Sequence, residues 1–205
     1  SIFSQTYSNF EIIIVDNYSS DKTIEKAKQF NISKILKIRK FLPGKAINLG
    51  IKKSKGEIIA ITDSDCVVSR NWLKRVSDNL DSNVYVQGPC QPRKNIKILQ
   101  KIQYSAFLVK VKYASNTSSY ISGANNAFRK ELIEDIGLFS EKSLNPTQDF
   151  INRIRAKGYT ITFSADMKVY TIFESNLINY TKQKLRWRVD TSLKSLIKTS
   201  TSKIF

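Results

Sequence analysis

The sequence has 205 residues, of which 41% are hydrophobic, so it is long enough for one domain with a substantial core, and no apolar stretch reaches the roughly 18 residues of a membrane-spanning helix. Lysine and arginine total 34 against 17 for aspartate and glutamate, and the net charge of +17 favours an anionic partner such as nucleic acid, a nucleotide diphosphate or an acidic membrane surface. The sequence contains no histidine, which excludes Ser-His-Asp and Cys-His catalysis and histidine-ligated zinc and makes a carboxylate the expected general base.

The first part of the chain predicts alternating strands and helices. Apolar runs at 11–15 and 56–62 are typical of strands buried on both faces, and 34–39 is a shorter strand. Between them, 22–30 and the segment from 43 to about 56 are expected to be helical. Strand, helix, strand, helix and strand in about fifty residues predict a parallel sheet with right-handed crossovers.

Acidic residues follow two of these strands. Asp16 comes directly after the first strand, and Asp63 and Asp65 come after the third. Open α/β sheets bind ligands at the carboxyl ends of their strands, and two carboxylates there can hold a divalent metal that grips a diphosphate. Taken alone, the acid-x-acid triplet favours a solvated turn, because aspartate and serine are ordinary turn residues.

The rest of the chain predicts further helices and strands around a polar loop at 123–126. Helices are expected at 70–80, 96–113, 129–136 and 147–158, and strands at 83–87, 119–122, 159–163 and 168–172. Thr147 is a candidate cap for the helix that carries Gln148 and Asp149 in its first turn.

Two absences narrow the chemistry further. The two cysteines, Cys66 and Cys90, lack metal-ligand spacing, which favours a reducing compartment. The glycines form neither a G-x-G-x-x-G pattern nor a P-loop, so the common phosphate-binding loops are missing.

Six short motifs follow one another along the chain. They are Ser4-Gln5-Thr6-Tyr7 with the later Asp16-Asn17, Ala46-Ile47-Asn48-Leu49-Gly50, Asp63-Ser64-Asp65, Gly123-Ala124-Asn125 with Phe128-Arg129, Gln148-Asp149-Phe150, and Gln183-Lys184-Leu185-Arg186-Trp187. In this order they resemble the family 2 glycosyltransferases, inverting enzymes with the GT-A fold, over nearly the whole chain. The resemblance implies an α/β fold with a Rossmann-like, mostly parallel sheet flanked by helices.

The resemblance implies that the first half of the chain binds a nucleotide-diphosphate sugar, such as a UDP- or GDP-sugar. Asp16 would contact the nucleotide base, and Lys45, where the family often has arginine, and Asn48 would lie in the donor site. Asp63 and Asp65 match the D-x-D motif, in which the first acid approaches the ribose or the metal and the last coordinates Mg²⁺ or Mn²⁺.

The later motifs imply the acceptor side of the reaction. Gly123 and Asn125 would lie near the transferred sugar, and Asp149 would be the base that takes the proton of the acceptor hydroxyl. Gln148 stands where the family usually has glutamate. The Q-x-x-R-W motif of polymerising members adds three donor-binding positions, Gln183, Arg186 and Trp187. The expected acceptor is a glycan or a lipid-linked sugar at the cytoplasmic face of a membrane.

The resemblance also divides the chain into functional parts. Residues 1–87 would form the nucleotide-sugar half, 88–175 the acceptor and catalytic half, and 176–205 a C-terminal segment. Family members begin with one further strand, which precedes Ser1 in sequence. In the sheet it lies between the strand that ends at Asp16 and the strand that precedes Asp63. This sequence is therefore expected to be truncated at its N-terminus and to have a gap in its sheet. Two unpaired strand edges would border that gap.

The segment 176–198 predicts a basic amphipathic helix. Leu185, Val189, Leu193 and Leu196 lie on one face, and lysines and arginines accompany them. Such a helix either binds an anionic membrane surface or packs on the sheet with its charges solvated, and both interpretations stay open.

Structural interpretations also exist for the motif residues. Asp149 in the first turn of a helix is stabilised by the helix dipole whatever its role, and Asp16 could simply begin a turn. Residues 183, 186 and 187 share one helix face, and without the resemblance this spacing favours an amphipathic packing face over phosphate binding.

Two other functions remain open. A nucleotidyltransferase could use a similar α/β sheet, and a non-catalytic nucleic-acid-binding module would use the positive charge. The basic residues are spread along the chain rather than interleaved with aromatic residues, so no nucleic acid is expected as a partner.

Overall fold

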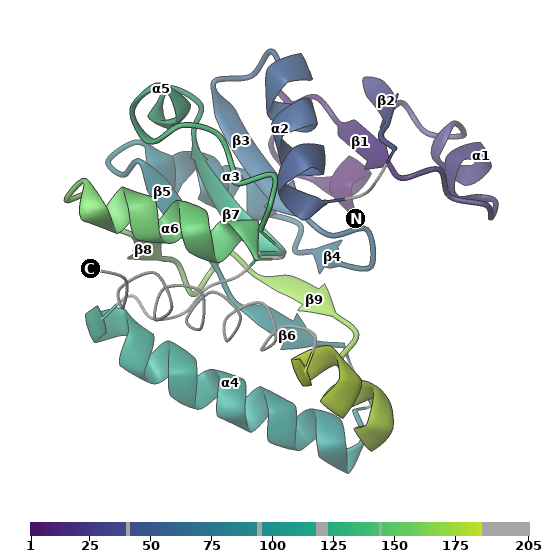
Figure 1. Ribbon diagram of the computed structural model, residues 1–205, viewed down its shortest axis with the longest axis vertical. Coiled ribbons are helices and arrows are strands. Elements are labelled where there is room, and N and C mark those ends of the chain that lie inside the picture. Colours follow the sequence, from purple (N-terminus) through teal and green to yellow (C-terminus); the bar gives the residue numbers. More distant parts are fainter. Residues whose placement is uncertain (40–41, 94–95, 118–122, 144, 186–205) are drawn as a thin grey trace, which may run out of the picture.

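The computed structural model describes residues 1–39, 42–93, 96–117, 123–143 and 145–185 (Figure 1). The strands are β1 (Ile13–Asp16), β2 (Lys34–Lys37), β3 (Ile58–Thr62), β4 (Val67–Val68), β5 (Tyr85–Gln87), β6 (Cys90–Pro92), β7 (Asn125–Arg129), β8 (Thr162–Phe163) and β9 (Val169–Thr171). The helices are α1 (Thr23–Ala27), α2 (Pro43–Lys53), α3 (Trp72–Leu80), α4 (Ile98–Thr117), α5 (Leu132–Ile136) and α6 (Pro146–Ala156), with a 3-10 turn at Ile2–Ser4. Residues 177–185 are also helical.

The described strands form three sheets. Strands β1 and β2 pair in parallel, as expected. The central sheet has the order β3-β7-β5-β8, in which β7 runs antiparallel to both β3 and β5 while β8 is parallel to β5. The third sheet has the order β4-β9-β6. The fold is therefore α/β with mixed sheets flanked by helices, which confirms the predicted fold class.

Strand β7 was not foreseen. The polar loop predicted at 123–126 and the helix predicted from 129 are wrong there, because Asn125–Arg129 is a strand that pairs with β3 on one side and β5 on the other. Asn125 and Asn126 have the composition of a turn, yet both side chains are buried. Two further expectations, the strand at 119–122 and the helix beyond 185, lie outside the described residues.

A hollow separates β1 from β3. The first and third predicted strands were expected in one parallel sheet, but β3 pairs with β7 and β1 pairs with β2. An open hollow of about 2760 Å³ extends from the space between them to α4 and the helix at 177–185, and its lining includes 12–15 on the β1 side and 58–62 on the β3 side. The expected gap in the sheet is therefore present.

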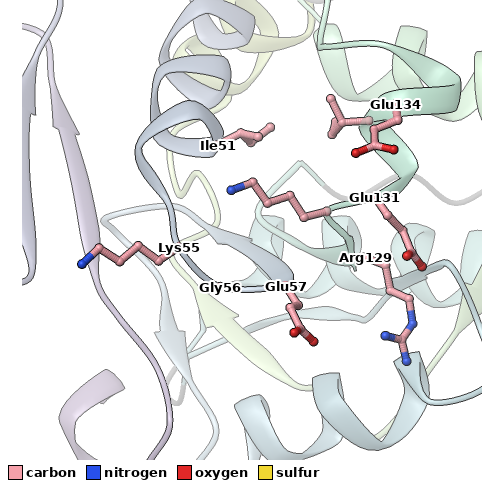
Figure 2. A pocket seen from close by; sticks show the side chains of 9 residues that line it. Ile51, Lys55, Gly56, Glu57, Arg129, Glu131 and Glu134 are labelled. Carbon is pink, nitrogen blue, oxygen red and sulfur yellow. The ribbon is translucent and has the colours of Figure 1, made fainter.

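The amino end of β3 opens on a smaller charged pocket of about 370 Å³ (Figure 2). Two of its cations are fixed to helix ends. Arg129 Nε donates to the carbonyl of Leu80, the last residue of α3, at 2.8 Å, and Lys130 Nζ donates to the carbonyl of Ser54, which follows α2, at 2.7 Å. Cations at the carboxyl ends of helices donate to carbonyls that lack partners and interact favourably with the helix dipole. The two cations of this pocket therefore connect the end of β7 to the ends of α3 and α2, which is a structural role.

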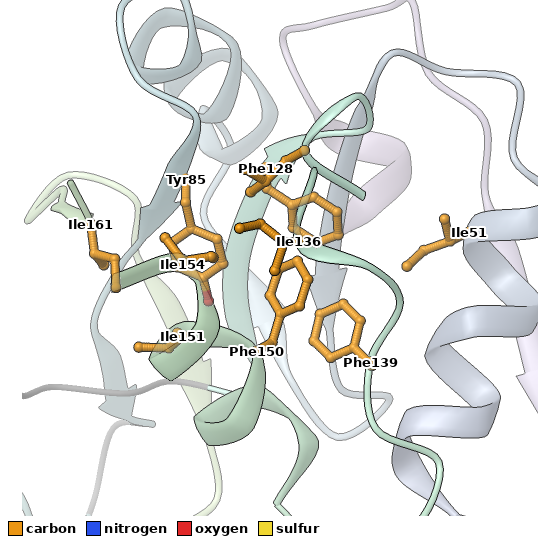
Figure 3. Close-up of a cluster of buried hydrophobic side chains, with 10 residues drawn as sticks. Ile51, Tyr85, Phe128, Ile136, Phe139, Phe150, Ile151, Ile154 and Ile161 are labelled. Carbon is orange, nitrogen blue, oxygen red and sulfur yellow. The ribbon is translucent and has the colours of Figure 1, made fainter. Parts of the chain in front are cut away.

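The core has one cluster on each face of the central sheet. Alternate residues of a strand face opposite sides, so Tyr85 and Phe128 pack towards α6 while Val86 and Ala127 pack towards α3. On the α6 side, aromatic rings dominate (Figure 3). The centroids of Phe139 and Phe150 are 4.1 Å apart, those of Phe128 and Phe150 are 5.3 Å apart, and those of Tyr85 and Phe128 are 6.2 Å apart. These contacts fix the start of α6 against the sheet.

Tyr85→Phe is expected to raise the free energy of unfolding by about 1 kcal/mol, because the Tyr85 hydroxyl is buried without a hydrogen-bond partner among the described residues. Burial also raises the pKa of this phenol. Urea unfolding would measure the change. Tyr159→Phe is the control, since its hydroxyl interacts with Asp135 and its loss should give no gain. A clear loss of stability in Tyr85→Phe would show that the hydroxyl is bonded in solution.

Helix α4 lies along the sheet formed by β4, β9 and β6 (Figure 1). The side-chain amides of Gln100 and Gln103 donate to the backbone carbonyls of Phe173 and Glu174, at 2.5 and 2.7 Å, and Tyr104 packs edge-on against Phe173. These contacts bring the helix at 177–185 beside the first half of α4. Among the helices that the structure describes, none has the length and apolarity needed to cross a membrane.

Candidate functional site

The acids that follow β3 lie on the rim of the large hollow. The strand ends at Thr62, and the backbone N–H of Cys66 donates to the carbonyl of Asp63 at 3.1 Å, which forms a tight turn before β4. Asp63 and Asp65 are both exposed to the hollow and belong to its lining. Partial burial by the surrounding chain, and then the charge of Asp65, raise the pKa of the Asp63 carboxyl. Two like charges on one turn are stabilised by a nearby cation.

Arg93 was not anticipated as part of this site. Its guanidinium donates to the backbone carbonyl of Asp65 at 2.8 Å, which ties the acidic turn to the chain after β6. The backbone N–H of Arg93 is itself bonded to the carbonyl of Thr171 at the end of β9. No sequence pattern indicates this contact, because the two residues are 28 positions apart and are brought together only when the strands between them fold.

The two carboxylates fit a divalent cation. Within the described part of the chain, no group of three or more histidine, cysteine, aspartate and glutamate side chains gathers into a metal site. Asp63 and Asp65 would thus be the carboxylate ligands, and a nucleotide diphosphate and water would have to supply the rest. Mg²⁺ commonly binds in this way, through one or two carboxylates together with substrate phosphates.

Neither Cys66 nor Cys90 forms a disulfide within the described part of the chain, and both lie on the wall of the same hollow. Burial raises the pKa of the Cys66 thiol to about 11, so it is protonated near neutral pH. A protonated thiol is a poor nucleophile, and Cys66 is therefore not a candidate for covalent catalysis.

Asp16 is buried at the carboxyl end of β1 and uses its carboxylate locally. Both oxygens accept the backbone N–H of Ser19, at 3.3 and 3.2 Å, and one also accepts the Ser19 hydroxyl. Tyr18 inside this turn has a positive φ of 53°. Asp16 thus fixes the turn that follows β1, and its predicted contact with a nucleotide base stays a prediction.

Asn48 joins α2 to the segment before α6. Its side chain accepts the backbone N–H of Phe139 at 2.9 Å and donates to the carbonyl of the same residue at 2.9 Å, and it also donates to Glu141 at 3.1 Å. Gly44 permits this close approach, because a Cβ at that position would lie 2.1 Å from the carbonyl oxygen of Ser140. Lys45, on the same helix, is exposed.

Asn125 is a buried hydrogen-bonding centre at the start of β7, directly opposite Thr62. Its amide oxygen accepts the indole N–H of Trp72 at 2.9 Å. Its amide nitrogen donates to the carbonyls of Pro89 and Met167, at 2.9 and 2.6 Å. One side chain therefore holds α3 and two loops around the end of β3. Gly123, two residues earlier, is exposed on the wall of the hollow.

Asn125→Leu is expected to cost about 3 kcal/mol or more of stability, because it leaves the Trp72 indole N–H and two buried carbonyls without partners. Denaturant unfolding would measure the loss. Asn152→Leu is the matched control, since Asn152 is exposed on α6 and should change stability by about 0.5 kcal/mol at most. If Asn125→Leu kept normal stability and lost only donor affinity, Asn125 would be a binding residue.

Asp149 lies in the first turn of α6. Asn145 caps this helix through its side chain, which accepts the N–H of Gln148 at 3.3 Å, so the predicted cap at Thr147 is wrong. Asp149 Oδ2 accepts Arg153 Nε at 3.1 Å, and 40% of the Asp149 side chain is exposed.

Arg153 holds the Asp149 carboxylate in place. Its guanidinium donates to the carbonyls of Ile136, Gly137 and Leu138 at the end of α5, that of Leu138 at 2.8 Å. The Asp149–Arg153 pair is therefore anchored to the core rather than free in solvent.

The hollow brings some of the predicted residues together and leaves others apart. Asp63, Asp65, Gly123 and Gln183 all line it. Asp149 is next in sequence to the lining residue Gln148. The side chains of Asp16, Asn48 and Asn125 instead form hydrogen bonds within the protein. Arg186 and Trp187 lie outside the described residues.

The fold matches solved structures over most of its length. A mannosyltransferase from Pyrobaculum calidifontis, PcManGT in complex with GDP-Man and Mn²⁺, aligns with a TM-score of 0.74 and 18% identity, covering 95% of this chain and 58% of that one. S. aureus TarS in complex with UDP aligns with a TM-score of 0.60 and 18% identity, covering 84% of this chain and 54% of that one. The fold is thus of the GT-A class.

Sequence comparison gives the family. The model of glycosyl transferase family 2 matches residues 1–137, and the chain belongs to this family.

Glycosyltransferase AglE of Haloferax volcanii is 28% identical over 183 residues, covering 82% of this chain and 59% of AglE. A poly-beta-1,6-N-acetyl-D-glucosamine synthase of Staphylococcus epidermidis is 24% identical over 200 residues, covering 91% of this chain and 48% of the synthase. The chain therefore spans about half to three fifths of the length of these relatives.

Proposed function

We propose that this protein transfers a sugar from a nucleotide-diphosphate sugar to a glycan or lipid-linked acceptor with inversion. The observation that carries the proposal is the hollow beside β3, which Asp63, Asp65, Gly123 and Gln183 all line, in a chain of glycosyl transferase family 2. A GDP- or UDP-sugar is the proposed donor, because GDP-Man and UDP occupy two proteins of the same fold.

Asp65, with Asp63, would hold Mg²⁺ or Mn²⁺ against the diphosphate. Such an ion would neutralise the negative charge that develops on the diphosphate as it leaves. Mn²⁺ accompanies GDP-Man in the P. calidifontis mannosyltransferase. The guanidinium of Arg93 donates to the backbone carbonyl of Asp65 and so would restrict the orientation of the Asp65 carboxylate.

Asp149 is the proposed base. The acceptor oxygen bonds to the anomeric carbon as the bond from that carbon to the diphosphate oxygen breaks, and the hydroxyl proton passes to the Asp149 carboxylate. Attack from the face opposite the leaving group inverts the anomeric configuration. Arg153 occupies Oδ2 at 3.1 Å, which leaves Oδ1 to accept the proton. Because Arg153 is itself fixed by three carbonyls, the carboxylate keeps one orientation.

The other predicted donor residues have supporting roles in this proposal. Asp16 orders the turn after β1, Asn48 sets the distance between α2 and the start of α6, and exposed Lys45 offers a charge for the donor. Residues 1–87 would bind the donor and 88–175 the acceptor, with the hollow shared between them. Gln183, Arg186 and Trp187 of the C-terminal segment would contribute to binding of the nucleotide sugar.

Donor-dependent release of a nucleoside diphosphate tests the proposal. The purified chain would be incubated with a panel of UDP- and GDP-sugars, Mg²⁺ or Mn²⁺, and glycan or lipid-linked acceptors. We expect UDP or GDP to be released in a metal-dependent manner with one donor class. Release of pyrophosphate from a nucleoside triphosphate would indicate a nucleotidyltransferase, and specific binding of nucleic acid without sugar turnover would indicate a binding module.

A further inference from the structure

The protein exposes large apolar side chains mainly in one region. Thirteen large hydrophobic residues are exposed in the described part of the chain, and eight of them come from 98–109 and 172–185. Figure 1 shows these segments together at one end of the molecule, far from α1. Single exposed hydrophobic residues are ordinary on a protein surface, but a cluster of this kind marks an interaction surface.

One face of helix α4 packs against the protein, and the opposite face exposes apolar side chains to solvent. Its inner face carries Gln103, Tyr104 and Phe107, which contact 173–174 or line the hollow. Its outer face carries Ile98 and Ile102, which are 74% and 60% exposed. Leu108 and Val109 continue this side of the helix at 46% and 55% exposure. A helix that is apolar on both sides needs a second apolar environment.

The helix at 177–185 extends the same surface. Leu177, Ile178 and Leu185 are between 60% and 63% exposed, and Ile172 before the helix is 62% exposed. Hydrogen bonds from α4 to the carbonyls of Phe173 and Glu174 hold this helix next to α4. We call the exposed apolar side chains of α4 and of 172–185 the apolar face.

The charges around the apolar face are positive. Lys97, Lys101 and Lys182 are exposed beside it. The sequence of α4 contains no acidic residue, and 176–205 contains seven basic residues and one acidic residue. Within 96–117 and 172–185 the only acidic residue is Glu174, and it is half-buried. Exposed aliphatic side chains ringed by lysines are suited to an anionic lipid surface.

We propose that the apolar face docks on an anionic phospholipid bilayer, with the aliphatic side chains entering the headgroup region and the lysines binding lipid phosphates. A second copy of the chain is a poorer occupant, because it would bring two sets of positive charges together. The sequence indicated lipid binding for the C-terminal segment alone, and the structure adds α4 to it.

Docking in this way would place the hollow beside the bilayer. Ile172 and Leu185 of the apolar face themselves line the hollow, and Gln103 and Phe107 line it from the inner face of α4. A lipid-linked acceptor could then reach the acids of the β3 turn while its lipid stays in the membrane. This consequence rests on the proposed function, whereas the docking itself does not.

Flotation with lipid vesicles tests the docking, using the 205-residue chain. Vesicles of phosphatidylglycerol and phosphatidylcholine should bind the protein, and vesicles of phosphatidylcholine alone should bind it far less. Lys97→Gln with Lys101→Gln should lower the partition coefficient roughly twenty-five-fold, at about fivefold for each lysine. Lys26→Gln with Lys52→Gln removes the same charge from exposed positions elsewhere and should have an effect of about twofold at most. Equal effects of the two lysine pairs would overturn the proposal.

The apolar contribution is tested separately. Ile98→Gln with Ile102→Gln should reduce binding roughly tenfold or more. Phe30→Gln, at a 56% exposed ring near α1, should not reduce it. Circular dichroism would check folding, which these exposed positions should not affect. Unchanged vesicle binding, together with a dimer of the wild-type chain that the isoleucine variant dissociates in sedimentation equilibrium, would assign the face to a second copy.

Activity separates this proposal from the proposed function. Release of nucleoside diphosphate with a water-soluble acceptor should be the same in the isoleucine variant and in the wild-type chain, because neither isoleucine lines the hollow. Loss of that release in the variant would place α4 in the catalytic machinery and overturn the docking role.

Discussion

Asp65→Ala is expected to abolish metal-dependent binding of the nucleotide sugar, and turnover with it. The substitution removes a hard anionic ligand that Ser64 cannot replace. Asp63 then remains as the single carboxylate of this turn, and one carboxylate holds a divalent cation less tightly than two. Calorimetric titration with a UDP- or GDP-sugar in the presence of Mg²⁺ or Mn²⁺ would measure the loss, and release of nucleoside diphosphate would measure turnover.

The fold should survive this change. The Asp65 side chain is exposed, and its link to Arg93 uses the backbone carbonyl, which alanine retains. Asp81→Ala is the matched control, because Asp81 is an exposed acid at the end of α3, away from the hollow. Unchanged donor affinity and metal dependence in Asp65→Ala would show that the D-x-D assignment is wrong.

Asp149→Asn is expected to lower turnover by about a hundredfold or more while leaving donor and metal binding nearly intact. Asparagine keeps the size and part of the hydrogen bonding of the side chain but is not a base. Steady-state release of nucleoside diphosphate would give turnover, and titration with donor would give affinity.

Stability separates a catalytic from a structural role for Asp149. Its ion pair with Arg153 is partly exposed, so its loss should change the free energy of unfolding by about 1 kcal/mol at most. A hundredfold loss of turnover with this small change would assign the base. Retained turnover would move the base elsewhere, and Glu141, which is bonded to Asn48, is the next acid to substitute. Loss of donor binding would make Asp149 structural.

The elements built on long apolar runs could be predicted from the sequence. Strands β1 and β3 and the acids that follow them lie where the runs at 11–15 and 56–62 indicated. These runs are informative because a strand buried on both faces needs apolar side chains at every position. Their pairing was not predictable, since β3 pairs with the distant β7 rather than with β1.

Strand β7 shows why the rest was missed. Its first two residues are asparagines, which locally favour turns because their side chains bond nearby backbone groups. In the folded protein Asn125 instead bonds Trp72, Pro89 and Met167, all distant in sequence. Tertiary hydrogen bonds of this kind leave no periodic pattern for a local analysis to detect.

The candidate site divides in the same way. Family resemblance located Asp63, Asp65 and Gln183, which the structure brings to one hollow. The resemblance also selected Asn48. The hydrogen bonds that the Asn48 side chain makes to Phe139 and Glu141 depend on packing that only the structure reveals. Arg93 and the carbonyls that hold Arg153 had no sequence signal.

The bonding of Asn125 has a consequence for how such a protein can evolve. One side chain ties α3, the turn at Pro89 and the loop at Met167 to the end of the strand that precedes the acidic turn. A substitution that shifts the backbone of any one of these segments would therefore break its hydrogen bond to Asn125 and disturb the other two. Gln148 and Gln183 border the hollow from separate elements and have no part in that network. Under the proposed function, substitutions there would alter sugar specificity while the acidic turn stays unchanged.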